Sequence, residues 1–254
     1  MISVALFAVA LLCPLAGASI GIAVRGRLPE HHLARDATDV IKLAMGLMAT
    51  LVALTLGLLI QSANRYRSTI ETEYKQILAG IVHLDEYLQA YGPEANAVRQ
   101  HVRQVAILSF QERWPGEDFG PVEPFPDSGR SRYTEIQREI VALHPADTAQ
   151  QWFQSQALQI TNRIADLRWL VVSQQTAHAP LLPVLCLIFL ASIVIFGSFT
   201  LYVRPNLTVV TVISLSALAI AGAIFLIVEL NNPFQGLLHI SSQAAHEVAQ
   251  TLGP

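Results

Sequence analysis

The sequence predicts an all-α membrane protein with four transmembrane helices and a helical, antiparallel coiled-coil-like domain inserted between the second and third of them. Three observations favour this class. Apolar residues make up 52% of the chain and charged residues only 14%, with a mean hydropathy of +0.44, which is typical of membrane proteins. Four apolar runs are long enough to cross a bilayer. Residues 61–180 hold 11 of the 16 Lys and Arg and 14 of the 19 Asp and Glu, so this central block belongs in water.

The predicted domains follow this alternation of apolar and charged segments. A helix of about 20 residues rises roughly 30 Å, which is enough to cross the hydrocarbon core of a bilayer. The predicted parts are a first transmembrane pair in 1–60 (spans 2–24 and 40–60), a soluble helical domain in 61–180, a second transmembrane pair in 181–230 (spans 181–201 and 207–230) and an interfacial C-terminal tail in 231–254.

The first apolar run has two interpretations. Ala16-Gly17-Ala18 resembles the cleavage site of a signal peptide, but no basic residue precedes the run and apolar sequence continues to Arg25. We therefore favour a retained span over a cleaved signal. Gly17 and Gly21 have the spacing that lets another helix approach closely.

The loop that leads into the second span carries His31, His32 and Asp36. Imidazole and carboxylate groups are both metal ligands and titratable groups, so these residues are candidates for metal binding or pH sensing. The alternative is that they are solvated and cap the interface, and it is favoured because no second cluster of ligands with a recognised spacing follows.

The second span contains a stripe of small residues, Ala49, Ala53 and Gly57, and one charge, Lys42. Small stripes usually allow close helix packing, but they can also line a narrow pore. Thr38 or Asp39 suits the N-cap of this helix, and Asp39 is placed to pair with Lys42 at the interface.

The helix of the second span is predicted to continue past the membrane to Tyr91, because Gly92-Pro93 is the first signal that ends it. Apolar residues in two stretches then repeat in steps of four and three, the spacing of a coiled-coil seam. The first stretch contains Ile70, Tyr74, Ile77, Ile81, Leu84, Leu88 and Tyr91, and the second contains Phe153, Ala157, Ile160, Ile164, Leu167 and Val171. We favour an intrachain antiparallel pair, while packing on a neighbouring subunit or on the helices between them stays open.

Several function classes find little support. Acids and bases are interleaved at a net charge of −3, so no basic face for nucleic acid is indicated. The sequence contains no P-loop, dinucleotide turn, HExxH helix or nucleophile elbow, so we expect neither an enzyme nor a cofactor. Cys13 and Cys186 lie inside apolar runs and are expected to pack as small apolar residues. Glu229 ends the fourth span, where headgroups and water are expected to make an acid tolerable.

Two stretches resemble the signature regions of the bacterial bestrophin-like family, a family of largely uncharacterised multi-pass membrane proteins. They are LPEHHLARDATDVIKLAMGLMATLVALTLGLLI and FLIVELNNPFQGLLHISS. The signature positions are Pro29, Asp39, Lys42, Glu229, Pro233, Phe234 and Gly236.

The more distant resemblance to true bestrophins implies a pentameric anion channel with both termini and the central domain in the cytosol. Counting basic residues near the spans does not decide the orientation, so the resemblance alone supplies it. Two departures stand against a full transfer. Residues 40–60 contain no aromatic residue where a bestrophin neck has phenylalanine, and the tail offers only Glu247 in place of an acidic calcium clasp.

We therefore expect a homo-oligomeric ion channel or pore, with an anion as the favoured ion, in the lipid bilayer of the cell inner membrane. In it Ala49, Ala53 and Gly57 would line the axis and Lys42 would stand near its outer mouth. The alternative is a non-conducting sensor or assembly module that binds a cytosolic partner through its helical domain.

Overall fold

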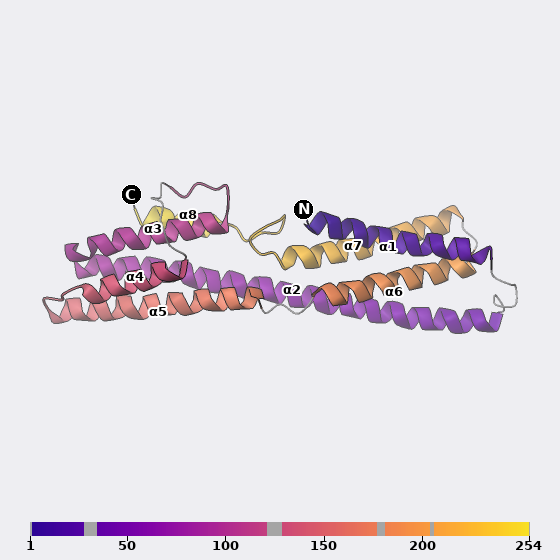
Figure 1. The fold of residues 1–254 in the computed structure, drawn as a ribbon, viewed down its shortest axis with the longest axis horizontal. Helices are drawn as coiled ribbons and strands as arrows, with labels where there is room; N and C mark the ends of the chain where they lie inside the picture. The colour runs from indigo at the N-terminus through magenta and orange to yellow at the C-terminus, as the bar shows by residue number, and fades with distance from the viewer. Residues whose placement is uncertain (1, 28–34, 121–128, 177–180, 204–205, 254) are drawn as a thin grey trace. The chain divides into compact units, whose positions relative to one another are not determined.

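The computed structural model describes residues 2–27, 35–120, 129–176, 181–203 and 206–253, and every regular element in them is helical (Figure 1). The all-α prediction is therefore confirmed for this part of the chain. The helices are α1 (Ile2–Arg25), α2 (Arg35–Tyr91), the 3₁₀ turn η2 (Pro93–Ala95), α3 (Asn96–Arg113), α4 (Gly129–Ala142), α5 (Thr148–Thr176), α6 (Leu181–Tyr202), α7 (Leu207–Leu230) and α8 (Gln243–Thr251).

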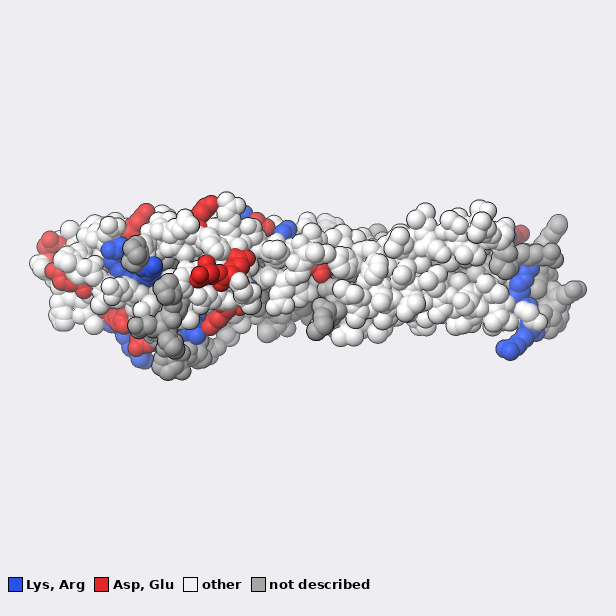
Figure 2. All heavy atoms as spheres, turned by 90° about the horizontal axis from the view of Figure 1, so that it is seen from above, with Lys and Arg blue, Asp and Glu red and all other residues white. Residues whose placement is uncertain are grey.

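The chain divides into two compact units. The membrane unit comprises Met1–Arg67 and His178–Asn232, and the helical unit comprises Ser68–Ala177 and Pro233–Pro254. Four helices, α1, α2, α6 and α7, are long and apolar enough to cross a membrane. Figure 2 shows a long band of the membrane unit, on the face in view, that has no Lys, Arg, Asp or Glu. The prediction of four membrane-capable helices is confirmed.

In the membrane unit, helices α1 and α6 approach each other closely through glycines. A Cβ atom at Gly17 would lie 2.5 Å from the carbonyl oxygen of Ile193, and one at Gly21 would overlap the carbonyl oxygen of Gly197 and the hydroxyl of Thr200. Thr200 donates its hydroxyl to the carbonyl oxygen of Ala18 at 2.8 Å. The predicted close packing of the small residues in α1 is confirmed, and its partner is α6.

Helix α7 completes the core of the membrane unit. Phe225 of α7 meets Phe7 of α1 edge to face, with ring centres 6.1 Å apart. The buried apolar residues come from all four membrane-capable helices and are Ala10, Leu56, Leu185, Ile188, Ala221, Ile224 and Ile227. Leu56 is the residue of α2 that is fully buried in this core, and Val52, Leu59 and Ile60 of α2 pack against it partly buried.

Helix α2 begins earlier than its predicted N-cap at Thr38 or Asp39. It starts at Arg35, because residues 35–38 include neither glycine nor proline, and Asp39 therefore lies inside its first turns. The predicted pair is confirmed, with Asp39 and Lys42 3.8 Å apart. The predicted continuation to Tyr91 is also confirmed, and Gly92 then turns the chain with a φ of +126° that favours glycine.

In the helical unit, α5 contacts the part of α2 that follows Arg67. Gln174 donates its amide to Glu73 at 2.8 Å, Ile164 packs against Gly80, and Gln150 donates to the carbonyl oxygen of Tyr91 at 2.9 Å. All seven predicted seam residues of α2 are buried. Of the predicted seam in α5, Ala157, Ile164 and Val171 are buried and the others are half-buried. Residues that come later in α2 contact residues that come earlier in α5.

The C-terminal tail joins the helical unit through a closed loop. Ile240 donates its main-chain N–H to the carbonyl oxygen of Pro233 at 2.7 Å, and Gly236 inside the loop has a φ of +97°. Helix α8 follows and buries Ala245 and Val248. The apolar side of the tail therefore has a protein partner, and its interfacial location stays a prediction.

Candidate functional site

Within the membrane unit, α2 is the least enclosed helix. Of the 18 residues in its most apolar stretch, only 11% are buried, against 22–33% in the corresponding stretches of the other three spans. The exposed side chains form two different faces. One face carries small or short residues and a lysine, namely Lys42, Gly46, Thr50, Ala53 and Gly57. The other carries large apolar residues, namely Leu43, Leu47, Leu51, Leu54 and Leu58.

The small face of α2 has open space in front of it. A Cβ atom added at Gly46 or Gly57 would meet no other atom within 4 Å. Thr50 turns its hydroxyl back to the carbonyl oxygen of Gly46 at 2.8 Å, which satisfies the group within its own helix. Apart from Lys42, this face therefore presents backbone and short side chains. The space that bulky residues would fill in front of it is open.

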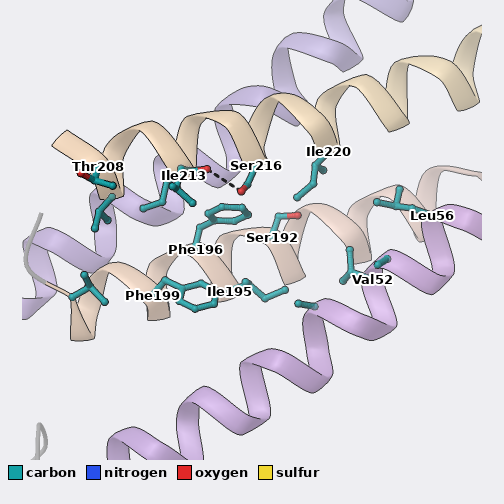
Figure 3. A pocket seen from close by; sticks show the side chains of 15 residues that line it. Val52, Leu56, Ser192, Ile195, Phe196, Phe199, Thr208, Ile213, Ser216 and Ile220 are labelled. Carbon is teal, nitrogen blue, oxygen red and sulfur yellow. Dashed lines mark hydrogen bonds between the residues drawn. The ribbon is translucent and has the colours of Figure 1, made fainter. Parts of the chain in front are cut away.

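An apolar groove of about 540 Å³ lies beside the small face, between α2, α6 and α7 (Figure 3). Val52 and Leu56 line it from α2, Phe196 and Ile195 from α6, and Ile213 and Ile220 from α7. Its serines are satisfied by their own helices, because Ser192 donates to the carbonyl oxygen of Ile188 at 2.8 Å and Ser216 to that of Val212 at 2.9 Å. The groove therefore suits apolar matter rather than an ion.

The predicted stripe of small residues divides between the groove and the open face. Ala49 and Ala53 line the groove, although Ala53 also belongs to the exposed small face, whereas Gly57 lies outside the groove with free space in front. The reason is helical geometry, since each step of four residues turns about 40° further around a helix of 3.6 residues per turn. Lys42 is exposed near the start of the helix, paired with Asp39.

The histidine candidates lie outside the described residues. His31, His32 and Pro29 are in the part of the chain that the structure leaves undescribed, and Asp36 lies in the first turn of α2 with its side chain undescribed. Among the residues that the structure does describe, no group of three or more His, Cys, Asp or Glu is placed to hold a metal ion. A metal or pH sensor in this loop stays a prediction.

The acid of the second signature stretch is buried. Glu229 is only 4% exposed near the end of α7. The expected solvation of this acid by water and headgroups is therefore wrong, because the packing around the end of α7 removes it from solvent. The two asparagines that follow close the helix, since Asn231 and Asn232 donate their side-chain amides to the carbonyl oxygens of Ile227 and Val228, each at 2.8 Å.

The rest of that stretch builds an aromatic cluster in the helical unit. Phe234 meets Tyr74 and Trp114 edge to face, with ring centres 5.6 Å away in each case. The guanidinium of Arg113 lies 4.6 Å over the Phe234 ring. Trp114 and Arg113 could not be predicted from the sequence, because these residues share no spacing with Tyr74 or Phe234.

Comparison with known proteins decides the family. The model of the bestrophin-like domain matches residues 12–245. The chain belongs to the bestrophin-like family. The resemblance inferred from the two signature stretches is thereby confirmed, and this bestrophin-like chain is an α-helical membrane protein.

A solved structure shows the same fold. A variant of a bacterial bestrophin homologue from Klebsiella pneumoniae superposes on this bestrophin-like chain with a TM-score of 0.62 over 97% of both chains, at 12% sequence identity. At that identity the likeness concerns the fold alone. No curated protein matches the chain.

Proposed function

We propose that this bestrophin-like chain assembles into a homo-oligomeric ion channel of the cell inner membrane, with the α2 helices around the axis. One observation supports this proposal above the others: α2 is the span least enclosed by its own chain, and it exposes a face without bulky side chains. A helix that faces other copies and a water path needs such a face, because small residues leave room for an ion.

Lys42 supports an anion as the permeant ion. Its ammonium is exposed at the start of α2 beside Asp39, and an exposed pair at 3.8 Å is held weakly. Copies of Lys42 around an axis would place several positive charges at one mouth, which attracts anions. Ala49, Ala53 and Gly57 are the proposed lining; Gly57 lies on the open face, and Ala49 and Ala53 also border the apolar groove.

The family resemblance also supports an arrangement across the membrane. We infer that the helical domain is inserted between the second and third spans as an antiparallel, coiled-coil-like pair of α2 and α5. The opposite order of the contacts from Glu73–Gln174 to Tyr91–Gln150 supports the pairing. The domain and both termini are proposed to be cytoplasmic, with His31, His32 and Asp36 outside as candidates for sensing metal or pH.

The test is ion flux from purified protein in liposomes, together with native mass spectrometry of the oligomer. We expect a defined oligomer that releases chloride, and we expect Gly57→Leu to reduce the flux strongly because it adds bulk on the open face. Leu58→Phe is the matched control, because it adds bulk at the next residue on the leucine face. A monomer, or equal effects of the two variants, would contradict the proposal. A folded oligomer without flux would favour the non-conducting module.

A further inference from the structure

The apolar groove of the membrane unit runs lengthwise, from one end of the spans toward their middle. Its lining begins at Val203, just after α6, and at Thr208 in the first turn of α7, and it extends along α7 to Ile220 (Figure 3). At 1.5 Å per residue, the part of α7 between Thr208 and Ile220 measures roughly 18 Å. The hydrocarbon of one leaflet takes up about 15 Å, half of a core of about 30 Å, so the groove has the length of one acyl chain.

The groove opens on the outside of the membrane unit. Phe199, Val203 and Val212 of its lining are exposed. Because α6 and α7 are apolar enough to cross a membrane, an opening between them faces lipid. An acyl chain brings no polar group that would need a hydrogen bond, so it suits a lining whose serines are already satisfied by their own helices.

Lys42 lies at the outer end of this groove. It precedes Ala49 and Leu56 by seven and fourteen residues, close to two and four turns, so the three residues share one face of α2. Ala49 and Leu56 both line the groove. Leu56 belongs to the cluster of Ile188, and Ala49 packs against the cluster of Phe196, so earlier residues of α2 lie beside later residues of α6. Lys42, two turns before Ala49, is therefore level with the end of α6.

The charge at this end of the membrane unit is positive. The end of α1 lies here too, because Gly21 contacts Thr200 near the end of α6. Figure 2 shows Lys and Arg atoms gathered at this end. Among the described side chains here, the bases are Arg25, Arg27 and Lys42, and the acid is Asp39, 3.8 Å from Lys42. One bound phosphate would leave the balance neutral or positive, so such a group is compatible with the anion preference proposed above.

We propose that this groove binds one acyl chain of an anionic phospholipid, with the phosphate of the headgroup beside Lys42. Lysine binds phosphate as a compact point charge. Thr208 lines the same end of the groove and offers a hydroxyl as a second donor. The occupant is a lipid rather than a free phosphate, because the length and the apolar lining match the chain and only the end matches the charge. This site does not depend on whether the chain conducts ions.

The experiment is native mass spectrometry of the full chain, purified in detergent and titrated with lipid. The probes are phosphatidylglycerol and phosphatidylethanolamine with the same acyl chains. We expect saturable binding of one phosphatidylglycerol per chain and about fivefold weaker binding of phosphatidylethanolamine, which has no net charge. Lys42→Gln should weaken phosphatidylglycerol binding about fivefold and abolish this difference. Lys75→Gln, at an exposed lysine of the helical unit, is the control and should change neither lipid.

A second pair of variants tests the groove itself. Ser216 lies midway along the lining, and Ser216→Phe should weaken the binding of both lipids at least about tenfold because the ring fills the space of the chain (Figure 3). Ser214→Phe makes the same change at an exposed serine of α7 outside the lining and should leave binding unchanged. If Ser216→Phe does not fold by circular dichroism, Val212→Phe in the lining and Val210→Phe outside it replace the pair.

Four outcomes would overturn the proposal. The first is the absence of saturable phosphatidylglycerol binding, and the second is equal binding of the two lipids. The third is an equal loss of binding in the lining variant and its control. The fourth is a lining variant that falls apart into monomers while its lipid binding is unchanged, which would mean that another copy of the chain fills the groove.

Discussion

Trp114 donates its indole N–H to the main-chain carbonyl oxygen of Ile240 at 3.0 Å, across 126 residues of sequence. Both residues are buried. This bond joins the end of α3 to the tail that carries the second family signature, so the signature holds the helical unit together as well as marking the family.

Trp114→Phe keeps a ring in the aromatic cluster and removes the donor. Because a buried carbonyl oxygen then loses its partner, we expect a loss of roughly 1–3 kcal/mol and faster release of the tail. The measurement is chymotrypsin cleavage near the exposed Leu237, with thermal unfolding in parallel. Trp152→Phe, at a half-exposed tryptophan, is the control, and equal cleavage rates for the two variants would rule out this role of Trp114.

Gly21→Ala tests the close approach of α1 and α6. The added methyl group would overlap Gly197 and Thr200, and we expect destabilisation of about 1–3 kcal/mol or more. The measurement is unfolding of the purified protein on titration with SDS. Gly57→Ala makes the same chemical change where a Cβ meets nothing within 4 Å, so it should unfold like the natural protein. The packing account fails if both variants unfold at the same SDS fraction.

Asp85→Asn tests the bidentate ion pair that joins α2 to α3. Arg99 donates to both carboxylate oxygens of Asp85 at 2.8 Å, and the pair is partly buried. We expect a loss of about 1.5–3 kcal/mol in thermal stability, because each bond involves charged groups. Lys75→Ala, which breaks the exposed pair with Glu71, should cost no more than about 0.5 kcal/mol.

The pH dependence of that pair follows from its arginine. The hydrogen bond with Asp85 raises the pKa of Arg99, with burial acting against it. A base whose folded pKa is raised contributes stability that is complete below its ordinary pKa and is lost only as the pH rises through the folded value. The effect of Asp85→Asn should therefore be the same at pH 7 and pH 9. A smaller effect at pH 9 would contradict the assignment.

Lys42→Glu tests the charge at the proposed mouth. If the α2 helices surround the axis, the change replaces a ring of positive charges with negative ones, and the preference for anions should fall or reverse. The measurement is the reversal potential in a planar bilayer under a potassium chloride gradient. Lys75→Glu, an exposed lysine of the helical unit, is the control. A reversal potential unaffected by Lys42→Glu would remove this lysine from the conduction path.

The spans were predictable because each is a long apolar run, and the bounds of α6 and α7 agree with the predicted ones to within a residue. The glycine spacing in α1 also predicted close contact with another helix. It did not identify α6, because the partner lies in a distant part of the sequence and several spans contain small residues.

Less of the helical unit could be predicted from the sequence. Periodicity indicates which face of α2 is buried, since it depends on neighbours three and four residues apart. The contacts of Trp114 with Tyr74 and Phe234 depend on distant segments meeting, and Trp114 belongs to no motif. Glu229 was misjudged for a similar reason, because its position in sequence indicates the end of a span but not the packing around it.

The contact between α1 and α6 also bears on how the protein is made. Gly17 leaves the ribosome roughly 180 residues before Ile193, and at about 5–20 residues per second this is a delay of roughly ten to thirty-five seconds. During that time α1 must remain in the bilayer, or against the insertion machinery, with its glycine surface uncovered. The first span of this chain therefore enters the membrane well before the helix that covers its glycines has been made.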